Sequence, residues 1–270
     1  MDFETFVTLP YVTQFTLWLS GRLESSDLRH GFLDRERGIE VSFSGLGDAL
    51  AQYEWKRCNY QDTQETLREF ELRLRTALER NDDLNLRCAA IDVLRWGGVS
   101  GGNKGWITKA PSLTEILRSG CTLLSGNDDS KAGSIGRFTA GMSKIYSLLV
   151  PEFVIYDSRV AAALAWLVRT WCEQTARASV PDALAFRWLS WKESQTSART
   201  KVRNASSGNY LFPCAYTSSQ KALWNMRASW LLSHVLNVGK QSVFHREQSP
   251  VRALEAALFM WGYDLRPFQV

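Results

Sequence analysis

The sequence predicts a fold that is all-α or nearly so, because apolar residues recur at helical spacing through most of the chain. Of its 270 residues, 45% are hydrophobic and 22% are charged, a composition that can bury a sizeable core and is not typical of disorder. Strand-like patterns are confined to two short apolar runs, residues 39–43 and 153–156. We therefore expect helices to carry the fold and short segments to connect them.

The helices can be placed from their start and stop signals. They are predicted over residues 62–80, 84–96, 112–124, 138–149, 158–171, 181–193, 219–237 and 249–262. Gly97 and Gly98 end the second of these, and Ser112 with Glu115 forms a capping box at the start of the third. Pro151 ends the helix over 138–149.

The connections are rich in glycine and polar residues. The stretch 99–105 is predicted to be a loop, as is 126–136. Residues 194–218 lack periodicity and are predicted to form a long loop, and long loops inside compact domains are often functional. Five basic residues against one acid, between positions 187 and 203, make the start of this loop basic.

The cysteines and the absence of targeting signals indicate a cytoplasmic protein. Five cysteines are scattered singly, without a CxxC pair, which favours reduced thiols over a disulfide framework. No stretch approaches the roughly 20 apolar residues of a membrane helix, and the first residues are acidic where a secretory signal would be basic. We expect no membrane association.

Several chemistries have no support in the sequence. His30, His234 and His245 form no cluster with acids or cysteines, so no metal site is predicted. Neither a P-loop nor a dinucleotide-binding glycine motif occurs, and no cofactor is expected. The net charge of +4 is compatible with nucleic acid but equally with many other enzymes.

The most informative segment is Ser134–Leu167. It contains a glycine-rich turn, a helix, the break at Pro151, the apolar run 153–156, and Asp157 at the start of an apolar helix. A carboxylate there lies near the positive end of the helix dipole, where a scaffold can fix a catalytic group. The alternative is that Asp157 is an ordinary N-cap, which is what most such residues are.

Gly133–Val160 resembles the core of helix-hairpin-helix DNA glycosylases, especially bacterial proteins related to 8-oxoguanine DNA glycosylases. The matching residues are Ser143-Lys144, Pro151, and Val154-Ile155-Tyr156-Asp157-Ser158-Arg159-Val160, with further likeness in 224–230 and 255–263. The resemblance covers about half of the chain in patches. It implies one glycosylase-like unit over 1–270, in which two helical subdomains flank a DNA-binding cleft. The central subdomain would span 62–156 with a degenerate hairpin at 126–149, and the remaining N- and C-terminal helices would form the second.

The sequence departs from the family pattern in two places. The usual Leu-Pro-Gly-Val-Gly type hairpin is absent, and Gly133-Ser134-Ile135-Gly136 is a degenerate form of it. The Schiff-base lysine of bifunctional members stands 19 residues before the aspartate, where this chain has Phe138; Lys144 lies 13 residues before it. These departures favour a monofunctional hydrolase.

The resemblance gives candidate roles to the following residues. Asp157 would be the catalytic carboxylate and Lys144 would assist, by contacting phosphate or base or by pairing with Asp157; the alternative for Lys144 is a solvent-exposed surface lysine. Candidates for the base pocket are Trp96, Trp106, Tyr210, Phe212 and Asn225. Candidates for DNA binding are Gly133, Gly136, Arg137, Arg159, Arg199, Lys201, Arg203 and Arg227.

Each of these assignments has a structural alternative. The aromatic residues can be core or loop packing, Arg159 can brace the fold, and the basic residues of the long loop can be a solvated charge run. Asn225, Arg227 and Glu255 lie on apolar helices, where they can face a cleft or satisfy buried backbone groups.

The expected function is hydrolysis of the N-glycosidic bond of a modified base flipped out of double-stranded DNA, by a monomeric protein. The departures from the repair pattern favour defence against phage DNA bearing glucosylated hydroxymethylcytosine. Repair of 8-oxoguanine is the alternative substrate assignment. A DNA-binding protein that lost the chemistry, and a helical module of a larger defence complex, are the non-enzymatic alternatives.

Overall fold

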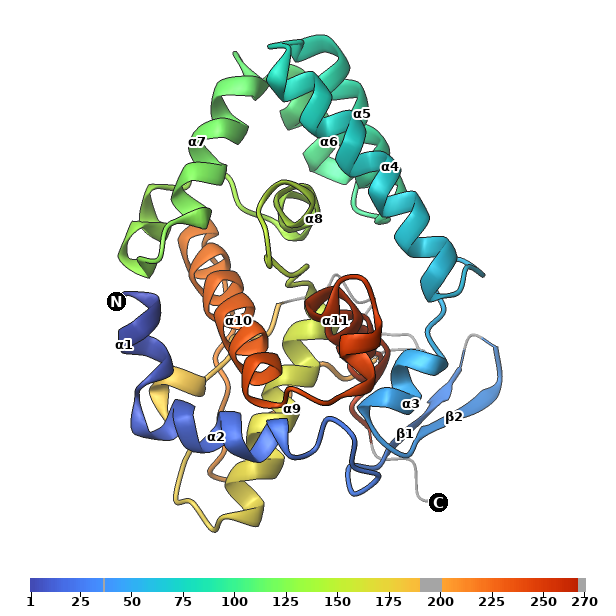
Figure 1. Ribbon diagram of the computed structural model, residues 1–270, viewed down its shortest axis with the longest axis vertical. Helices are drawn as coiled ribbons and strands as arrows, with labels where there is room; N and C mark the ends of the chain where they lie inside the picture. The colour runs from blue at the N-terminus through green and yellow to red at the C-terminus, as the bar shows by residue number, and fades with distance from the viewer. Residues whose placement is uncertain (36, 190–200, 267–270) are drawn as a thin grey trace. The chain divides into compact units, whose positions relative to one another are not determined.

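The computed structural model describes residues 1–35, 37–189 and 201–266, and within these ranges the protein is mainly helical (Figure 1). The α-helices are α1 (Phe3–Val7), α2 (Pro10–Ser20), α3 (Leu46–Ala51), α4 (Tyr60–Glu79), α5 (Asp83–Trp96), α6 (Gly101–Lys109), α7 (Leu113–Ser125), α8 (Ala140–Leu149), α9 (Ser158–Gln174), α10 (Ser218–Val238) and α11 (Pro250–Trp261). Short 3-10 helices lie at Asp129–Ser134, Asp182–Leu184 and Val243–Arg246. The predicted all-α class is confirmed at this level.

One antiparallel hairpin accompanies the helices. Strand β1 (His30–Asp34) pairs with β2 (Ile39–Phe43), with His30 opposite Phe43. The strand-like run at 39–43 is thus confirmed, whereas its partner at 30–34 was not predicted.

The chain divides into two compact units. The first consists of Met1–Phe3, Trp55–Tyr156 and Thr217–Ser229; the second consists of Glu4–Glu54, Asp157–Tyr216 and Trp230–Val270. The chain therefore passes from the first unit to the second at the peptide bond before Asp157.

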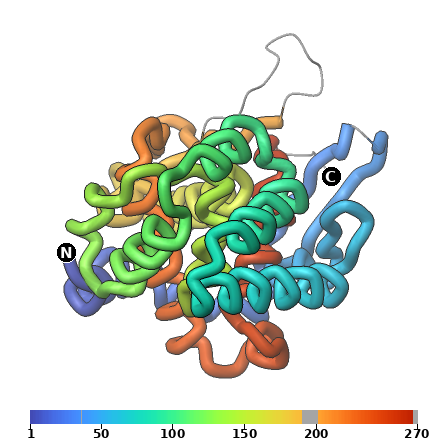
Figure 2. Tube along the Cα trace, turned by 90° about the horizontal axis from the view of Figure 1, so that it is seen from above, coloured from blue at the N-terminus to red at the C-terminus, as the bar shows by residue number. Residues whose placement is uncertain are grey.

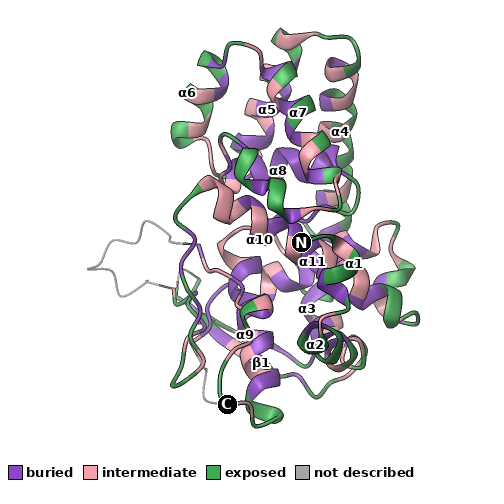
Figure 3. Ribbon diagram, turned by 90° about the vertical axis from the view of Figure 1, so that its left-hand side faces the viewer, coloured by how far each residue is buried: buried purple, intermediate pink, exposed green. Residues whose placement is uncertain are grey.

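Helix α8 is the buried centre of the first unit. Every residue from Gly141 to Leu149 is buried, and α4, α5 and α7 all pack against this helix (Figure 3). Helix α5 also contacts α4, α6 and α7, so that the helices of this unit lie side by side (Figure 2). Ser112 caps α7 by accepting a hydrogen bond from the Glu115 amide, as the capping signal predicted.

Helices α9 and α11 form the core of the second unit. The two helices pack together, and α11 also packs on α3. The indoles of Trp171 and Trp261 are almost fully buried and belong to this core. Among the described residues, no helix combines the length and the apolar character that crossing a membrane requires.

Three of the sequence-based assignments are wrong, each because of tertiary contacts. Residues 99–105 are not simply a loop, since α6 begins at Gly101; the fully buried Ile107 anchors this helix, and that packing outweighs the low helix propensity of glycine. In the predicted helix 181–193, the described part contains only a 3-10 turn, after which Trp188 pairs with Cys214; residues 190–193 lie outside the described ranges. The run 153–156 forms no strand.

His30 makes the stability of the second unit depend on pH. The centre of its ring lies 5.3 Å from that of Trp261. Burial lowers the pKa of His30 from the ordinary value of 6.5, against the opposing hydrogen bond that the ring donates to the Asp264 carbonyl, and the charge of Arg169 lowers the pKa further. Above pH 6.5 the ring is neutral in both folded and unfolded chains. Below it, the unfolded chain takes up a proton that the folded chain resists, so stability falls.

We expect the free energy of unfolding to decrease by up to about 1.4 kcal/mol per pH unit below pH 6.5 through this single group. Denaturant titrations of the native chain and His30→Gln at several pH values measure it. The free energy of unfolding of the variant should depend less steeply on pH below 6.5. Equal pH dependence in the two proteins would contradict the role given to His30.

Candidate active site at the start of helix α9

Asp157 is the N-cap of α9. Its Oδ1 accepts hydrogen bonds from the backbone amides of Arg159, at 2.9 Å, and Val160, at 3.2 Å. The helix that follows is deeply buried, with Ala161 and Leu164 fully inaccessible. The capping role considered for Asp157 is therefore confirmed. It also fixes a half-buried carboxylate on a rigid element, at the positive end of the helix dipole.

Tyr263, directly after the last turn of α11, gathers three cationic side chains near this cap. The guanidinium of Arg159 lies 4.6 Å from the centre of its ring, and Nζ of Lys201 lies 4.0 Å from it. Arg203 donates from Nε to the Tyr263 carbonyl, at 3.4 Å, and from Nη1 to the hydroxyl of Ser158. Four of the predicted residues, Asp157, Arg159, Lys201 and Arg203, thus belong to one cluster in the second unit, which we call the α9 cluster together with Ser158 and Tyr263.

Backbone pairing holds the end of the long loop at this place. The Val202 amide donates to Oδ1 of Asp264 at 3.0 Å, and the Leu265 amide donates to the Val202 carbonyl at 2.8 Å. The segment 201–203 is therefore attached to 263–265, next to α9. No local signal in the sequence predicts this pairing, because about 60 residues separate the two segments.

The cluster combines half-buried Arg159 and Lys201 and buried Arg203 with the carboxylates of Asp157 and Asp34, and Oδ1 of Asp34 accepts from the Tyr263 hydroxyl at 3.0 Å. Burial lowers the pKa of the Arg159 guanidinium, and the charge of Asp157 raises it in opposition. An arginine stays protonated at neutral pH, so Arg159 keeps its positive charge. The centre of the Phe259 ring lies 4.0 Å from the same guanidinium. The cations of the cluster can bind an anionic group, and the Asp157 carboxylate can stabilise a positive charge that develops beside it.

Arg203 differs from its predicted role. It is only 6% exposed, so it is neither part of a solvated charge run nor a surface contact to a DNA strand. Its hydrogen bonds tie Ser158 to Tyr263, which makes it a positioning residue for the start of α9. Arg199 lies outside the described residues.

In the first unit, a set of side-chain hydrogen bonds supports the irregular segment 153–156. The amide of Tyr156 donates to Oγ of Ser143, at 2.8 Å, and that hydroxyl donates to Oδ1 of Asn225, at 2.6 Å. Nδ2 of Asn225 donates to the Val154 carbonyl at 2.8 Å, and the Val154 amide donates to Oγ of Ser229 at 3.1 Å. Side chains therefore satisfy the backbone of residues 153–156 in place of a neighbouring strand. This support extends to Tyr156, the residue before Asp157.

Asn225 consequently does not line a base pocket. It is fully buried, and its amide group is engaged with Ser143 and Val154. Of the two alternatives that the sequence left open, satisfaction of buried backbone is correct for Asn225.

Asn225→Ala is expected to destabilise the protein by about 3 kcal/mol, because it leaves the Val154 carbonyl and the Ser143 hydroxyl without their partner in the interior. Urea denaturation measures this loss. Asn85→Ala, at an exposed position on α5, serves as the control and should cost less than about 1 kcal/mol. Comparable losses in the two variants would show that the Asn225 bonds carry no special weight.

Lys144 is buried in the first unit, with 5% of its surface exposed. Its aliphatic carbons lie against Gly97, where a Cβ atom would fall 2.7 Å from Cε. The alternative of a solvent-exposed surface lysine is therefore wrong. Its catalytic role stays a prediction.

The remaining base-pocket candidates are divided between the two units. Trp96 packs against Trp55, with ring centres 6.3 Å apart, in the first unit. In the second unit, the Tyr210 hydroxyl donates to the Arg177 carbonyl, at 2.9 Å, and Phe212 is buried. Trp106, by contrast, lines a pocket in the first unit.

Arg227 is not available to DNA in the way that the sequence suggested. Its Nε donates to Oδ2 of the buried Asp129 at 2.7 Å, and its guanidinium lies 5.2 Å from the centre of the Trp224 ring. Oδ1 of Asp129 also accepts from the N-terminal amino group of Met1 at 2.7 Å, so Arg227 belongs to a buried ion-pair network whose disruption would cost stability. Gly133 and Gly136 are exposed, with open space where a side chain would project.

Comparison with known proteins gives no match: no protein-family model, no curated protein and no solved structure matches the chain significantly. The likeness to helix-hairpin-helix glycosylases therefore stays a prediction. Within the described ranges, no group of three or more histidine, cysteine or acidic side chains is placed to hold a metal ion.

Proposed function

We propose that this chain is a monofunctional DNA N-glycosylase in which Asp157 is the catalytic carboxylate. The observation that carries the proposal is the α9 cluster. There the Asp157 carboxylate, held by two backbone amides, caps the same first turn of α9 that contains Ser158 and Arg159. Lys201 joins it from the basic loop, while the buried Arg203 positions the helix start through Ser158 and Tyr263. A fixed carboxylate next to cations suits a substrate with phosphates around a sugar that becomes cationic.

In the proposed reaction, the bond between C1′ and the base nitrogen breaks, and its electron pair leaves with the base. Asp157 stabilises the positive charge that develops on the deoxyribose and orients the attacking water. The water oxygen bonds to C1′, and one of its protons finally resides on the released base. The products are a free base and an abasic site.

Hydrolysis is favoured over lyase chemistry by the residue at the position of the family's lysine. Phe138 stands there, buried and stacked on Tyr146 with ring centres 5.8 Å apart. A phenyl ring cannot form the Schiff base through which bifunctional members cleave the strand. We propose a glucosylated hydroxymethylcytosine of phage DNA as the substrate, with 8-oxoguanine as the second candidate.

One incubation series tests both the activity and the substrate. The purified protein is incubated with unmodified duplex DNA, duplex DNA containing 8-oxoguanine, and phage DNA bearing glucosylated cytosines. Mass spectrometry identifies released bases, and alkali cleavage reveals abasic sites. Release of the glucosylated base alone is expected. Release of 8-oxoguanine instead would assign the protein to repair, and no release from any substrate would contradict the glycosylase proposal.

The non-catalytic alternatives are separated by DNA binding. A DNA-binding protein without chemistry would bind duplex DNA with salt-dependent affinity and release no base. A helical interaction module would show no affinity for DNA at all.

A further inference from the structure

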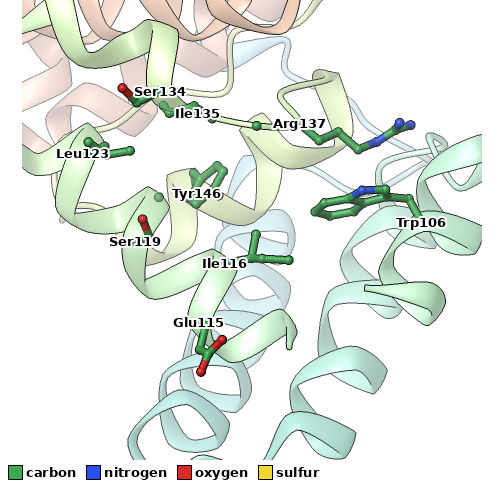
Figure 4. Close-up of a pocket in the computed structure, with 11 residues that line it drawn as sticks. Trp106, Glu115, Ile116, Ser119, Leu123, Ser134, Ile135, Arg137 and Tyr146 are labelled. Atoms are coloured by element: carbon green, nitrogen blue, oxygen red, sulfur yellow. The ribbon is translucent and has the colours of Figure 1, made fainter. Parts of the chain in front are cut away.

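The first unit contains a pocket that includes no residue of the α9 cluster. It has a volume of about 590 Å³ and lies between α6, α7, α8 and the segment 134–137 (Figure 4). All of its lining residues belong to the first unit, whereas Asp157 belongs to the second. Its volume falls within the range of small-molecule sites, and its walls include Ile116, Leu123 and Ile135.

Close packing between α7 and α8 shapes the floor of this pocket. Tyr146 lies against Gly120, where any side chain would collide with the tyrosine ring. The ring is also stacked on Phe138, with an interplanar angle of 3°. Burial raises the pKa of Tyr146, so its hydroxyl stays protonated. The floor is therefore rigid and uncharged.

One side of the pocket carries a cation on an aromatic face. The guanidinium of Arg137 lies 5.6 Å from the centre of the Trp106 indole, and its Nη2 donates to Oδ1 of Asn103 at 3.3 Å. Its Nε is buried, and among the described residues no hydrogen-bond partner for this atom is found. Arginine beside an aromatic face is a recurrent arrangement for binding a phosphate together with a stacked base.

An acid stands elsewhere on the rim. Glu115 projects from α7, whereas Trp106 lies on α6, on the opposite side of the pocket (Figure 4). A carboxylate accepts hydrogen bonds and cannot donate them when ionised, so it recognises an amino group and disfavours a second phosphate or a carbonyl edge.

We propose that this pocket binds a nucleotide whose base carries an exocyclic amino group. The base lies on the apolar wall beside Trp106, its phosphate binds Arg137, and its amino group donates to Glu115. The occupant can be a free mononucleotide or a nucleotide within a single strand, which share this chemistry. The inference does not rest on the proposed glycosylase activity, because no residue of the α9 cluster takes part in it.

Calorimetric titration of the full chain with AMP tests the site. AMP should bind saturably. Adenosine, which lacks the phosphate, and TMP, which lacks the exocyclic amine, should each bind about tenfold more weakly or worse. Competition between AMP and a short oligodeoxyadenylate distinguishes a free mononucleotide from a nucleotide within a strand. If the natural occupant lies within a strand, the oligonucleotide should bind more tightly than AMP and displace it. Failure of AMP to bind at millimolar concentration would overturn the proposal.

Two conservative variants assign the contacts. Arg137→Gln should abolish the preference for AMP over adenosine, and Glu115→Gln should abolish the preference for AMP over TMP. Lys131→Gln removes an exposed charge that does not line the pocket, so it should change neither preference. If Arg137→Gln binds AMP as the native chain does, the phosphate is not held at this place and the proposal is wrong. AMP binding should persist in Asp157→Asn. The test of the nucleotide pocket therefore does not depend on the outcome of the glycosylase assay.

Discussion

Asp157→Asn is expected to reduce base release about a thousandfold or more while the protein stays folded and bound to DNA. Asparagine is isosteric with aspartate and caps helices about as well, so its side-chain oxygen can keep the hydrogen bonds from the Arg159 and Val160 amides. What it removes is the negative charge that would stabilise a cationic sugar. Single-turnover release of the base measures the effect, with denaturant titration to confirm the fold.

Asp82→Asn is the matched control for that experiment. Asp82 is also an N-cap aspartate, on α5 of the first unit, and accepts a hydrogen bond from the Asn85 amide at 3.0 Å. It should leave base release unchanged. Asp157→Ala, which also loses the cap, should cost about 1 kcal/mol of stability in addition to activity. Near-native base release by Asp157→Asn would show that Asp157 only caps its helix.

Local signals account for the helices that were predicted correctly. The caps at Ser112 and Asp157 each satisfy amides within three residues, so the sequence window that encodes them is short. Helix α6 was missed because its three glycines favour a loop, and its stability comes from the buried Ile107 and from packing on α5. Such packing has no signature in a window of a few residues.

The candidate site was predictable in part for the same reason. Asp157 and Arg159 are two residues apart in the sequence, and their position at the start of an apolar helix marks them. The long-range hydrogen-bond partners of Asn225 and Arg227, by contrast, lie 71 to 98 residues away along the chain, so neighbouring residues could not reveal these bonds. Tyr263 was missed as well, because its contacts with Asp34, Arg159 and Lys201 all come from segments distant in the sequence.

Gly262→Ala is expected to be the most disruptive small substitution in the second unit. Gly262 is the C-cap of α11, where a Cβ atom would lie 2.7 Å from the carbonyl carbon of Arg159 and 3.0 Å from the amide nitrogen of Ala163. Both are backbone atoms of a buried helix and cannot rotate away, so α9 and α11 must separate. We expect a loss of about 3 kcal/mol, measured by the denaturant midpoint.

Gly105→Ala provides the opposite expectation from the same chemical change. Gly105 is exposed in α6, and nothing lies within 4 Å of the position where its Cβ would be. Because alanine is the better helix former, this variant should be more stable by up to about 1 kcal/mol. Equal effects of the two substitutions would contradict the close approach at Gly262.

The substitution at Gly262 should also reduce base release in whatever fraction of the protein stays folded. Tyr263 follows directly and contacts Arg159 and Lys201, so a shift of α11 moves the aromatic ring on which both cations lie. The same shift acts on the first turn of α9, whose amides hold the Asp157 carboxylate. Glycine is needed here for space and not for its backbone conformation, because its φ of −84° is open to any residue. A folded Gly262→Ala protein with native activity would mean that the position of α11 does not set the geometry of the α9 cluster.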